Sequence, residues 1–341
     1  MGAIHCHCIS SRAETGPILD EALRSEPKRH LKESSAPAGA TNLPIEGLFA
    51  GEGLFALQIY QARRRIANYE AMIQLESELQ ASLSSEVAAQ FRLLGPFLPY
   101  FRDRNAAIVR LPNGSVYYGE SSDKDQFHGE GCLVTGEGVI TEGMWSKGLL
   151  NGKGRMIYVN GDYYEGDWVA GNPEGEGKYV TAGGSTYIGK WTNGKQSGIG
   201  SEHWPDGALY TGCFSQGMKH GQGHFKWADG SEYSGQFSHN SLEGEGRYRW
   251  ADGREYSGGW KDNKMHGKGR FLWPDGKTYE GDYLADKKEG KGLFTWPEGN
   301  TYEGEWYNNR MHGVGVMSDP VTGRRKGEWR DGKRVRWLSN S

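Results

Sequence analysis

Short runs in which hydrophobic and polar residues alternate fill the chain from about residue 107 to residue 337. In the stretch 269–292, Phe271 and Trp273 alternate with polar or smaller neighbours, and Tyr279 and Tyr283 do so after a Pro-Asp-Gly turn. Alternation with period two places the aromatic side chains of a strand on one face. Two such runs around a turn predict a β-hairpin, and the polar residues from Leu284 onward are expected to cross to the next hairpin.

Glycines hold this pattern in register. One glycine returns every 23 residues from Gly143 to Gly327, and a second does so from Gly131 to Gly315. A fixed period of this length is typical of one supersecondary unit stacked many times. The predicted fold class is therefore mainly β: an elongated single-layer array of 23-residue β-hairpin repeats. Because glycine has no side chain, its place between two aromatic residues suggests that a large group lies over it, either a ring of the next hairpin or a ligand.

Seven units carry the pattern Tyr-x-Gly-x-aromatic, each followed by Gly-x-Gly. They are Tyr164-Gly166-Trp168, Tyr187-Gly189-Trp191, Tyr210-Gly212-Phe214, Tyr233-Gly235-Phe237, Tyr256-Gly258-Trp260, Tyr279-Gly281-Tyr283 and Tyr302-Gly304-Trp306. This pattern resembles the MORN (membrane occupation and recognition nexus) repeat. The end units depart from it at Ser121, Thr141 and Arg325, as capping repeats do. With the end units, the array is expected to span residues 107–337 in about nine to ten hairpins.

The aromatic residues of these units are the candidate partner-binding residues. A single-layer sheet cannot bury both of its faces, so one aromatic-lined face is predicted to receive a helix or peptide of a protein partner. The resemblance implies the same, because MORN arrays bind partner helices along such a groove. The residues are Tyr164, Trp168, Tyr187, Trp191, Tyr210, Phe214, Tyr233, Phe237, Tyr256, Trp260, Tyr279, Tyr283, Tyr302 and Trp306.

The region before the repeats divides into two parts. Residues 1–45 are polar, contain scattered prolines and lack periodicity, so they are predicted to be a disordered tail. Residues 50–95 are predicted to be α-helical, with one apolar stripe from Tyr69 to Phe91 and a stop at Gly95 and Pro96. We favour packing of this helix against the chain's own repeats. Docking on another protein and self-association as a coiled-coil homodimer are the alternatives.

The N-terminus predicts a membrane address. Removal of Met1 makes Gly2 the first residue of a sequence that suits N-myristoylation, although Cys6 stands where Ser or Thr is usual. One myristoyl chain binds membranes only weakly, so palmitoylation of Cys6 and Cys8 is predicted as the second signal. The expected location is the cytoplasmic face of a membrane (plasma membrane or cortex), with a cytoskeletal or ciliary association as an alternative. Unmodified cysteines are the simpler interpretation, and a metal site is disfavoured because adjacent ligands lack the usual zinc spacing.

A basic cluster near the C-terminus offers a second contact with membranes. Seven basic residues stand there against Glu328 and Asp331: Arg324, Arg325, Lys326, Arg330, Lys333, Arg334 and Arg336. An excess of positive charge of this kind attracts anionic lipid or an acidic partner. A solvated cap that prevents end-to-end stacking explains it equally well.

Composition argues against several function classes. The net charge of −3 gives no basic field, so no nucleic-acid partner is predicted. The histidines His128, His220, His266 and His312 share one position of the repeat with other polar residues, so no metal site is predicted. No phosphate loop, nucleophile elbow or kinase signature is found, and therefore no catalytic residue and no cofactor is predicted. No apolar run approaches the roughly 20 residues of a membrane-spanning helix.

These observations predict a non-enzymatic, membrane-associated scaffold. The aromatic face of its repeats would tether a cytoskeletal or signalling partner, while the acylated tail would supply membrane attachment. The alternatives are a module that binds phosphoinositides or other anionic lipids, and a structural component of the cilium or cell cortex.

Overall fold

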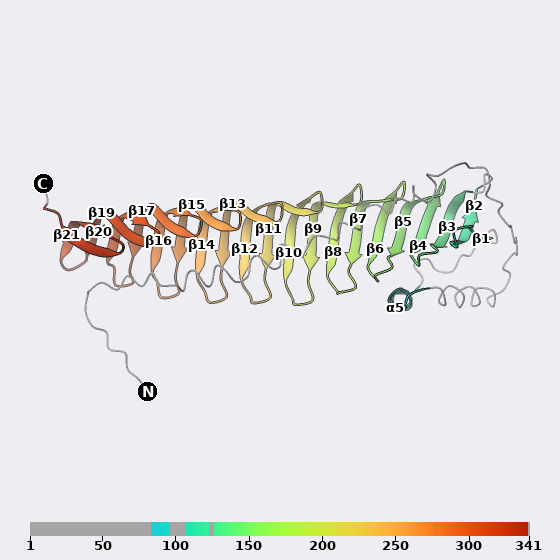
Figure 1. The fold of residues 1–341 in the computed structure, drawn as a ribbon, viewed down its shortest axis with the longest axis horizontal. Coiled ribbons are helices and arrows are strands. Elements are labelled where there is room, and N and C mark those ends of the chain that lie inside the picture. The colour runs from blue at the N-terminus through green and yellow to red at the C-terminus, as the bar shows by residue number, and fades with distance from the viewer. Residues whose placement is uncertain (1–82, 96–106, 123–125, 340–341) are drawn as a thin grey trace, which may run out of the picture. The chain divides into compact units, whose positions relative to one another are not determined.

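The computed structural model describes residues 83–95, 107–122 and 126–339. These residues form the helix α5 (Ser85–Leu94) and the strands β1 to β21, which lie between Ala107 and Trp337 (Figure 1). The chain divides into two compact units. Among the described residues, the first unit runs up to Met218 and the second unit begins at Lys219.

In the first unit, each strand pairs antiparallel with the next. The strands are β1 (Ala107–Arg110), β2 (Val116–Ser121), β3 (Phe127–Val134), β4 (Ile140–Ser146), β5 (Leu149–Ile157), β6 (Tyr163–Val169), β7 (Asn172–Val180), β8 (Thr186–Thr192), β9 (Lys195–His203) and β10 (Leu209–Ser215).

The second unit continues the same antiparallel pattern. Its strands are β11 (Met218–Lys226), β12 (Glu232–Ser238), β13 (Ser241–Arg249), β14 (Glu255–Lys261), β15 (Lys264–Leu272), β16 (Thr278–Leu284), β17 (Lys287–Thr295), β18 (Thr301–Tyr307), β19 (Arg310–Asp319), β20 (Gly323–Arg330) and β21 (Lys333–Trp337).

Two kinds of turn alternate between the strands. In the turn that contains Asp275, the carboxylate accepts a hydrogen bond from the Lys277 amide, and Gly276 takes a φ of +89°. In the other kind, Ala285 and Asp286 both have positive φ, the conformation of a type I′ hairpin turn. The Asp286 carboxylate also accepts from the Met265 amide, 21 residues earlier, at 2.8 Å. This second turn therefore ties each hairpin to the one before it.

The predicted fold class is confirmed: the protein is mainly β, built from hairpin repeats, with a helix before them. The predicted disordered tail and the segment 50–82 lie outside the described residues. α5 is capped by the Ser84 hydroxyl, which accepts a hydrogen bond from the Val87 amide, and its C-cap is Gly95, where the sequence predicts the stop. No helix among the described residues is both long enough and apolar enough to cross a membrane.

α5 packs against the strands of the first unit. Val87 is fully buried and lies in one hydrophobic cluster with Val134, Ile140, Ile157 and Tyr163. The described part of the predicted helical segment therefore packs on the chain's own repeats.

Candidate partner-binding face

A tyrosine packs over a pair of glycines in each regular repeat. Gly281 of β16 lies opposite Gly292 of β17, and a Cβ atom added to Gly281 would come within 2.6 Å of the Tyr279 hydroxyl. That hydroxyl donates a hydrogen bond to the Asp282 carbonyl at 3.1 Å. The ring over Gly281 thus belongs to the same strand and not, as expected, to the next hairpin, whereas over Gly292 the same Tyr279 ring comes from the neighbouring hairpin. Only glycine leaves room for the ring, which explains the 23-residue register.

The aromatic residues predicted to bind a partner form a ladder between hairpins. The Tyr279 ring meets Tyr283 edge to face at 5.2 Å and Trp306 of the following hairpin at 5.1 Å. Such pairs stabilise a structure by about 0.5–1.5 kcal/mol beyond the area they bury. All fourteen side chains are at most 5% exposed. In this structure they form the interior of the hairpins rather than an open contact surface. We call the side of the strands that carries them the inner face, and the opposite side the outer face.

A second aromatic row fills the inner face beside the hairpin turns. The rings of Phe271 and Trp273 lie 4.3 Å apart and tilted by 39°, and the Trp273 ring lies 5.7 Å from that of Phe294 in the next hairpin. The same contacts link Phe225, Trp227, Tyr248 and Trp250 earlier in the second unit. The two rows together make the core of the second unit, which explains how a chain with few aliphatic residues folds.

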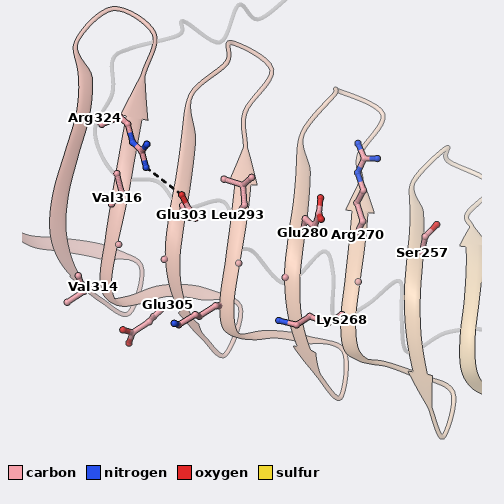
Figure 2. A pocket seen from close by; sticks show the side chains of 16 residues that line it. Ser257, Lys268, Arg270, Glu280, Leu293, Glu303, Glu305, Val314, Val316 and Arg324 are labelled. Carbon is pink, nitrogen blue, oxygen red and sulfur yellow. Dashed lines mark ion pairs between the residues drawn. The ribbon is translucent and has the colours of Figure 1, made fainter.

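The outer face of the second unit carries an open groove (Figure 2). Its volume is about 1020 Å³, and glycines of β15 to β19 form its floor, because they place no side chain there. Side chains from neighbouring strands rise around this floor: Ser257, Lys268, Arg270, Glu280, Lys291, Leu293, Glu303, Glu305, Val314, Val316 and Arg324.

Both apolar and charged groups line this groove. Leu293 and Val314 are 38% and 40% exposed, which is unusual for aliphatic side chains on a sheet. Lys268 pairs with Asp282 at 2.5 Å, and Arg324 lies 3.7 Å from Glu303. Exposed pairs of this kind stabilise the fold little and remain available to a ligand. The groove therefore suits a peptide that offers apolar anchors and charges of both signs.

α5 covers part of the corresponding outer face of the first unit. Beneath the helix, Arg155 pairs with Glu142 and also donates a hydrogen bond to the Gly95 carbonyl at the helix end. Both charged side chains are almost fully buried, and burial also raises the pKa of the neighbouring Cys132 thiol. A helix can thus dock on the outer face when that face supplies an apolar bed and a partner for its terminal carbonyl.

The apolar bed under α5 is a local departure from the repeat. Val134, Ile140, Ile157 and Tyr163 contact the helix there. Six repeats later, the same positions carry Leu272, Thr278, Thr295 and Thr301. The position of α5 is therefore encoded in the first unit.

Two lysines, Lys219 and Lys288, are buried in the core of the second unit, and Lys288 lies among four rings. The Lys288 ammonium nitrogen sits 4.8 to 5.2 Å from the ring centres of Trp273, Tyr279, Phe294 and Trp306, and the residue is 3% exposed. Other repeats place Leu242 or Met265 at this position. Burial lowers the pKa of Lys288 to about 7.

The remaining predicted sites are placed as follows. The seven basic residues near the C-terminus are all exposed on β20 and β21, where Arg336 pairs with Glu328 and the Arg334 guanidinium lies 4.3 Å from the centre of the Trp337 ring. The four histidines lie on β3, β11, β15 and β19, and the described residues contain no group of three or more potential metal ligands. Gly2, Cys6 and Cys8 lie outside the described residues.

The role of the outer face was not predicted from the sequence. Leu293, Val314 and Val316 lie between inward-facing positions, so strand alternation alone could have placed them opposite the aromatic rows. The signal was their departure from charged residues at the same positions of other repeats, Arg270 for Leu293 and Val316, and Lys291 for Val314. The buried Lys288 could not be found this way, because lysine is common in the polar stretches.

Comparison with known proteins agrees with this geometry. The MORN repeat family matches the chain over residues 142–163, 164–186, 187–209, 210–232, 233–253, 256–278, 279–301, 302–322 and 326–335. The chain therefore belongs to the MORN repeat family. No curated protein matches it.

Among solved structures, the chain is similar to the TCP10 domain of Danio rerio CPAP in complex with a peptide of Danio rerio STIL. The identity is 13%, with 69% of this chain and 99% of that chain covered and a TM-score of 0.38. It is also similar to the TCP domain of Drosophila melanogaster SAS-4 in complex with a proline-rich motif of Ana2, at 16% identity, 55% and 99% coverage, and a TM-score of 0.30. Both scores are below 0.5, so we infer nothing about function from them.

Proposed function

We propose that this MORN repeat protein is a non-enzymatic scaffold that binds a protein partner and holds it at a membrane. The observation that carries this proposal is the open groove on the outer face of the second unit, with exposed Leu293 and Val314 over a glycine floor. A large exposed apolar surface with polar surroundings is typical of an interaction site. The aromatic rows keep the hairpins rigid, so that this face is formed before a partner arrives.

The partner site is tested by affinity purification of the full chain from cells. Leu293→Asp and Val316→Asp place carboxylates in the groove without touching the inner face, so we expect the associated protein to be lost while thermal stability is kept. The matched control is Val169→Asp, which changes an exposed valine of the first unit. Retention of every associated protein by the groove variants would contradict the proposal.

Membrane attachment is assigned to the acylated N-terminus. Gly2 and the pair Cys6 and Cys8 supply the two acyl signals that stable attachment needs. A C-terminally tagged chain is expected at a membrane, and both Gly2→Ala and the double change Cys6→Ser/Cys8→Ser are expected to release it. If all three chains share one distribution, the tail does not direct localisation.

The exposed basic residues of β20 and β21 support a second function, binding of anionic lipid. Their side chains project where a lipid headgroup can reach them, and Trp337 beside Arg334 is a residue type that favours membrane interfaces. This function predicts that binding to phosphoinositide-containing liposomes survives Gly2→Ala and is lost when Arg330, Lys333 and Arg334 are neutralised. A structural role in the cilium or cortex instead predicts fractionation that resists detergent.

A further inference from the structure

Two isoleucines stand exposed on the outer face of the first unit. Ile188 of β8 is 48% exposed and Ile199 of β9 is 70% exposed. They are diagonal neighbours, because Gly189 pairs with Gly200 in the register of these strands. Ile199 in turn lies opposite Cys213 of β10, which is half-buried. At the position of Ile188, other repeats carry Glu142, Glu165 or Glu280. The apolar pair therefore replaces charge where the repeat usually keeps it.

The charges around this pair are mostly positive. On the outer face of β8, β9 and β10 the ionisable side chains are Lys190, Lys195 and His203, and the carboxylate of Glu202 points to the inner face. On β7, Lys178 lies opposite Ile188, while Glu176 lies opposite Lys190 and places a negative charge at the edge of this surface. The neighbouring strands β5 and β6 differ, because Lys153 there is neutralised by Asp167 at 2.7 Å.

We propose that this surface, formed by Ile188, Ile199, Lys190 and Lys195, is a second docking site that binds an acidic amphipathic segment of a partner protein. The proposal rests on the proposed function as a scaffold. Aliphatic side chains of the segment cover the two isoleucines, and carboxylates beside them meet the two lysines. α5 shows that the outer face of this unit accepts an apolar helix stripe, since its Val87 packs on Val134 of β3 and Ile157 of β5, three to six strands away from the isoleucines. Charge complementarity fixes the orientation of the segment.

Two other occupants would give different results. The chain's own residues 69–82 combine aliphatic residues with Glu70, Glu76 and Glu78, and a second copy of the chain could cover the apolar pair. The experiment must therefore identify which polypeptide segment lies over Ile199.

Photo-cross-linking from position 199 makes this identification. The full chain carries a photoreactive phenylalanine derivative in place of Ile199, cells are irradiated, and the cross-linked peptides are sequenced by mass spectrometry. We expect a segment of another protein that contains aliphatic and acidic residues. Introducing Lys190→Glu and Lys195→Glu into this chain should reduce its yield about tenfold, because both charges of the site are then reversed. The matched control places the photoreactive residue at Lys153, where no product is expected.

A parallel chain with the photoreactive residue at Leu293 separates this inference from the proposed function. If a partner peptide is cross-linked from position 293 but none from position 199, the second docking site is overturned, while the groove remains supported as a partner site. Products that contain residues 69–82, or that join two copies of this chain, would overturn the partner assignment, and so would a yield that the charge reversal leaves unchanged. Thermal unfolding of each variant shows whether the fold is kept. Where a charge reversal perturbs the fold, the charge-neutral variant Ile188→Ser, which leaves position 199 to the photoreactive residue, repeats the cross-linking experiment and should likewise reduce the yield.

Discussion

At the scale of single residues, the 23-residue register depends on glycine positions where the structure has no room for a Cβ atom. Gly281 has no positive φ, so alanine is acceptable to its backbone, yet a Cβ atom there would lie 2.5 Å from the Gly292 Cα and 2.6 Å from the Tyr279 hydroxyl. Gly281→Ala is therefore expected to lower the free energy of unfolding by about 2 kcal/mol, the usual cost of overpacking. Urea unfolding measures this. The exposed neighbour Glu280 provides the control, because Glu280→Ala should change stability by less than about 0.5 kcal/mol.

Lys288 makes a second prediction at this scale, concerning pH. The groups around its amine are four aromatic rings, and the titratable ones nearby, Tyr279 and Tyr283, stay neutral because burial raises their pKa. No carboxylate among the described residues pairs with this amine. Its pKa is therefore about 7 in the folded chain, whereas the pKa of lysine in the unfolded chain is about 10.4. Cation–π contacts with the rings favour the protonated amine, but they do not replace the hydration that the amine loses on burial.

The sign of the pH effect follows from proton binding. Between pH 7 and about 10 the unfolded chain binds more protons than the folded chain, so stability rises with pH by up to about 1.4 kcal/mol per unit. Below pH 7 both states are protonated, and the contribution of Lys288 is constant. Lys288→Met should remove the rise between pH 7 and pH 9 in urea titrations, whereas Lys287→Met, next to it and exposed, should keep it. An unchanged slope in the Lys288 variant would show that the amine stays charged.

At the scale of elements, α5 is held by one buried stripe. Val87 is fully buried while Leu93 on the same helix is 80% exposed, so the two give a matched pair. Val87→Asp should lower the free energy of unfolding by about 3 kcal/mol. The variant either buries an unpaired charge or detaches the helix and exposes the hydrophobic cluster beneath it. Limited proteolysis is expected to cleave the segment 83–95 faster in this variant and at the native rate in Leu93→Asp. Equal cleavage of both would mean that α5 does not depend on the cluster.

The elements were largely predictable from the sequence, while their packing was not. Period-two alternation and Pro-Asp-Gly turns gave the hairpins because both are local signals that tertiary contacts here reinforce. The ring over Gly281 was assigned to the wrong hairpin, because spacing in sequence does not tell in which direction Tyr279 leans. The aromatic residues were predicted as a surface because a single sheet seemed to leave one face bare. Two aromatic rows, including Trp273 and Phe294, in fact fill that face.

At the scale of the whole molecule, each unit presents an outer face that its own core does not use. In the first unit α5 covers part of this face, and in the second unit the groove lies open. The residues that form the core and the residues that form the docking surface are therefore different, so one set can change without altering the other. Substitutions in the groove should therefore alter binding with little loss of stability, and substitutions in the aromatic rows should do the reverse.

Hydroxyl-radical footprinting tests this account most directly. The full chain is labelled alone and again in the complex purified from cells. We predict that Tyr279 and Trp306 are protected in both samples, while Leu293 and Val314 are labelled in the free chain and protected in the complex. If the aromatic rows were labelled in the free chain and protected only in the complex, the aromatic residues would be the contact surface after all. The outer face would then lose its assigned role.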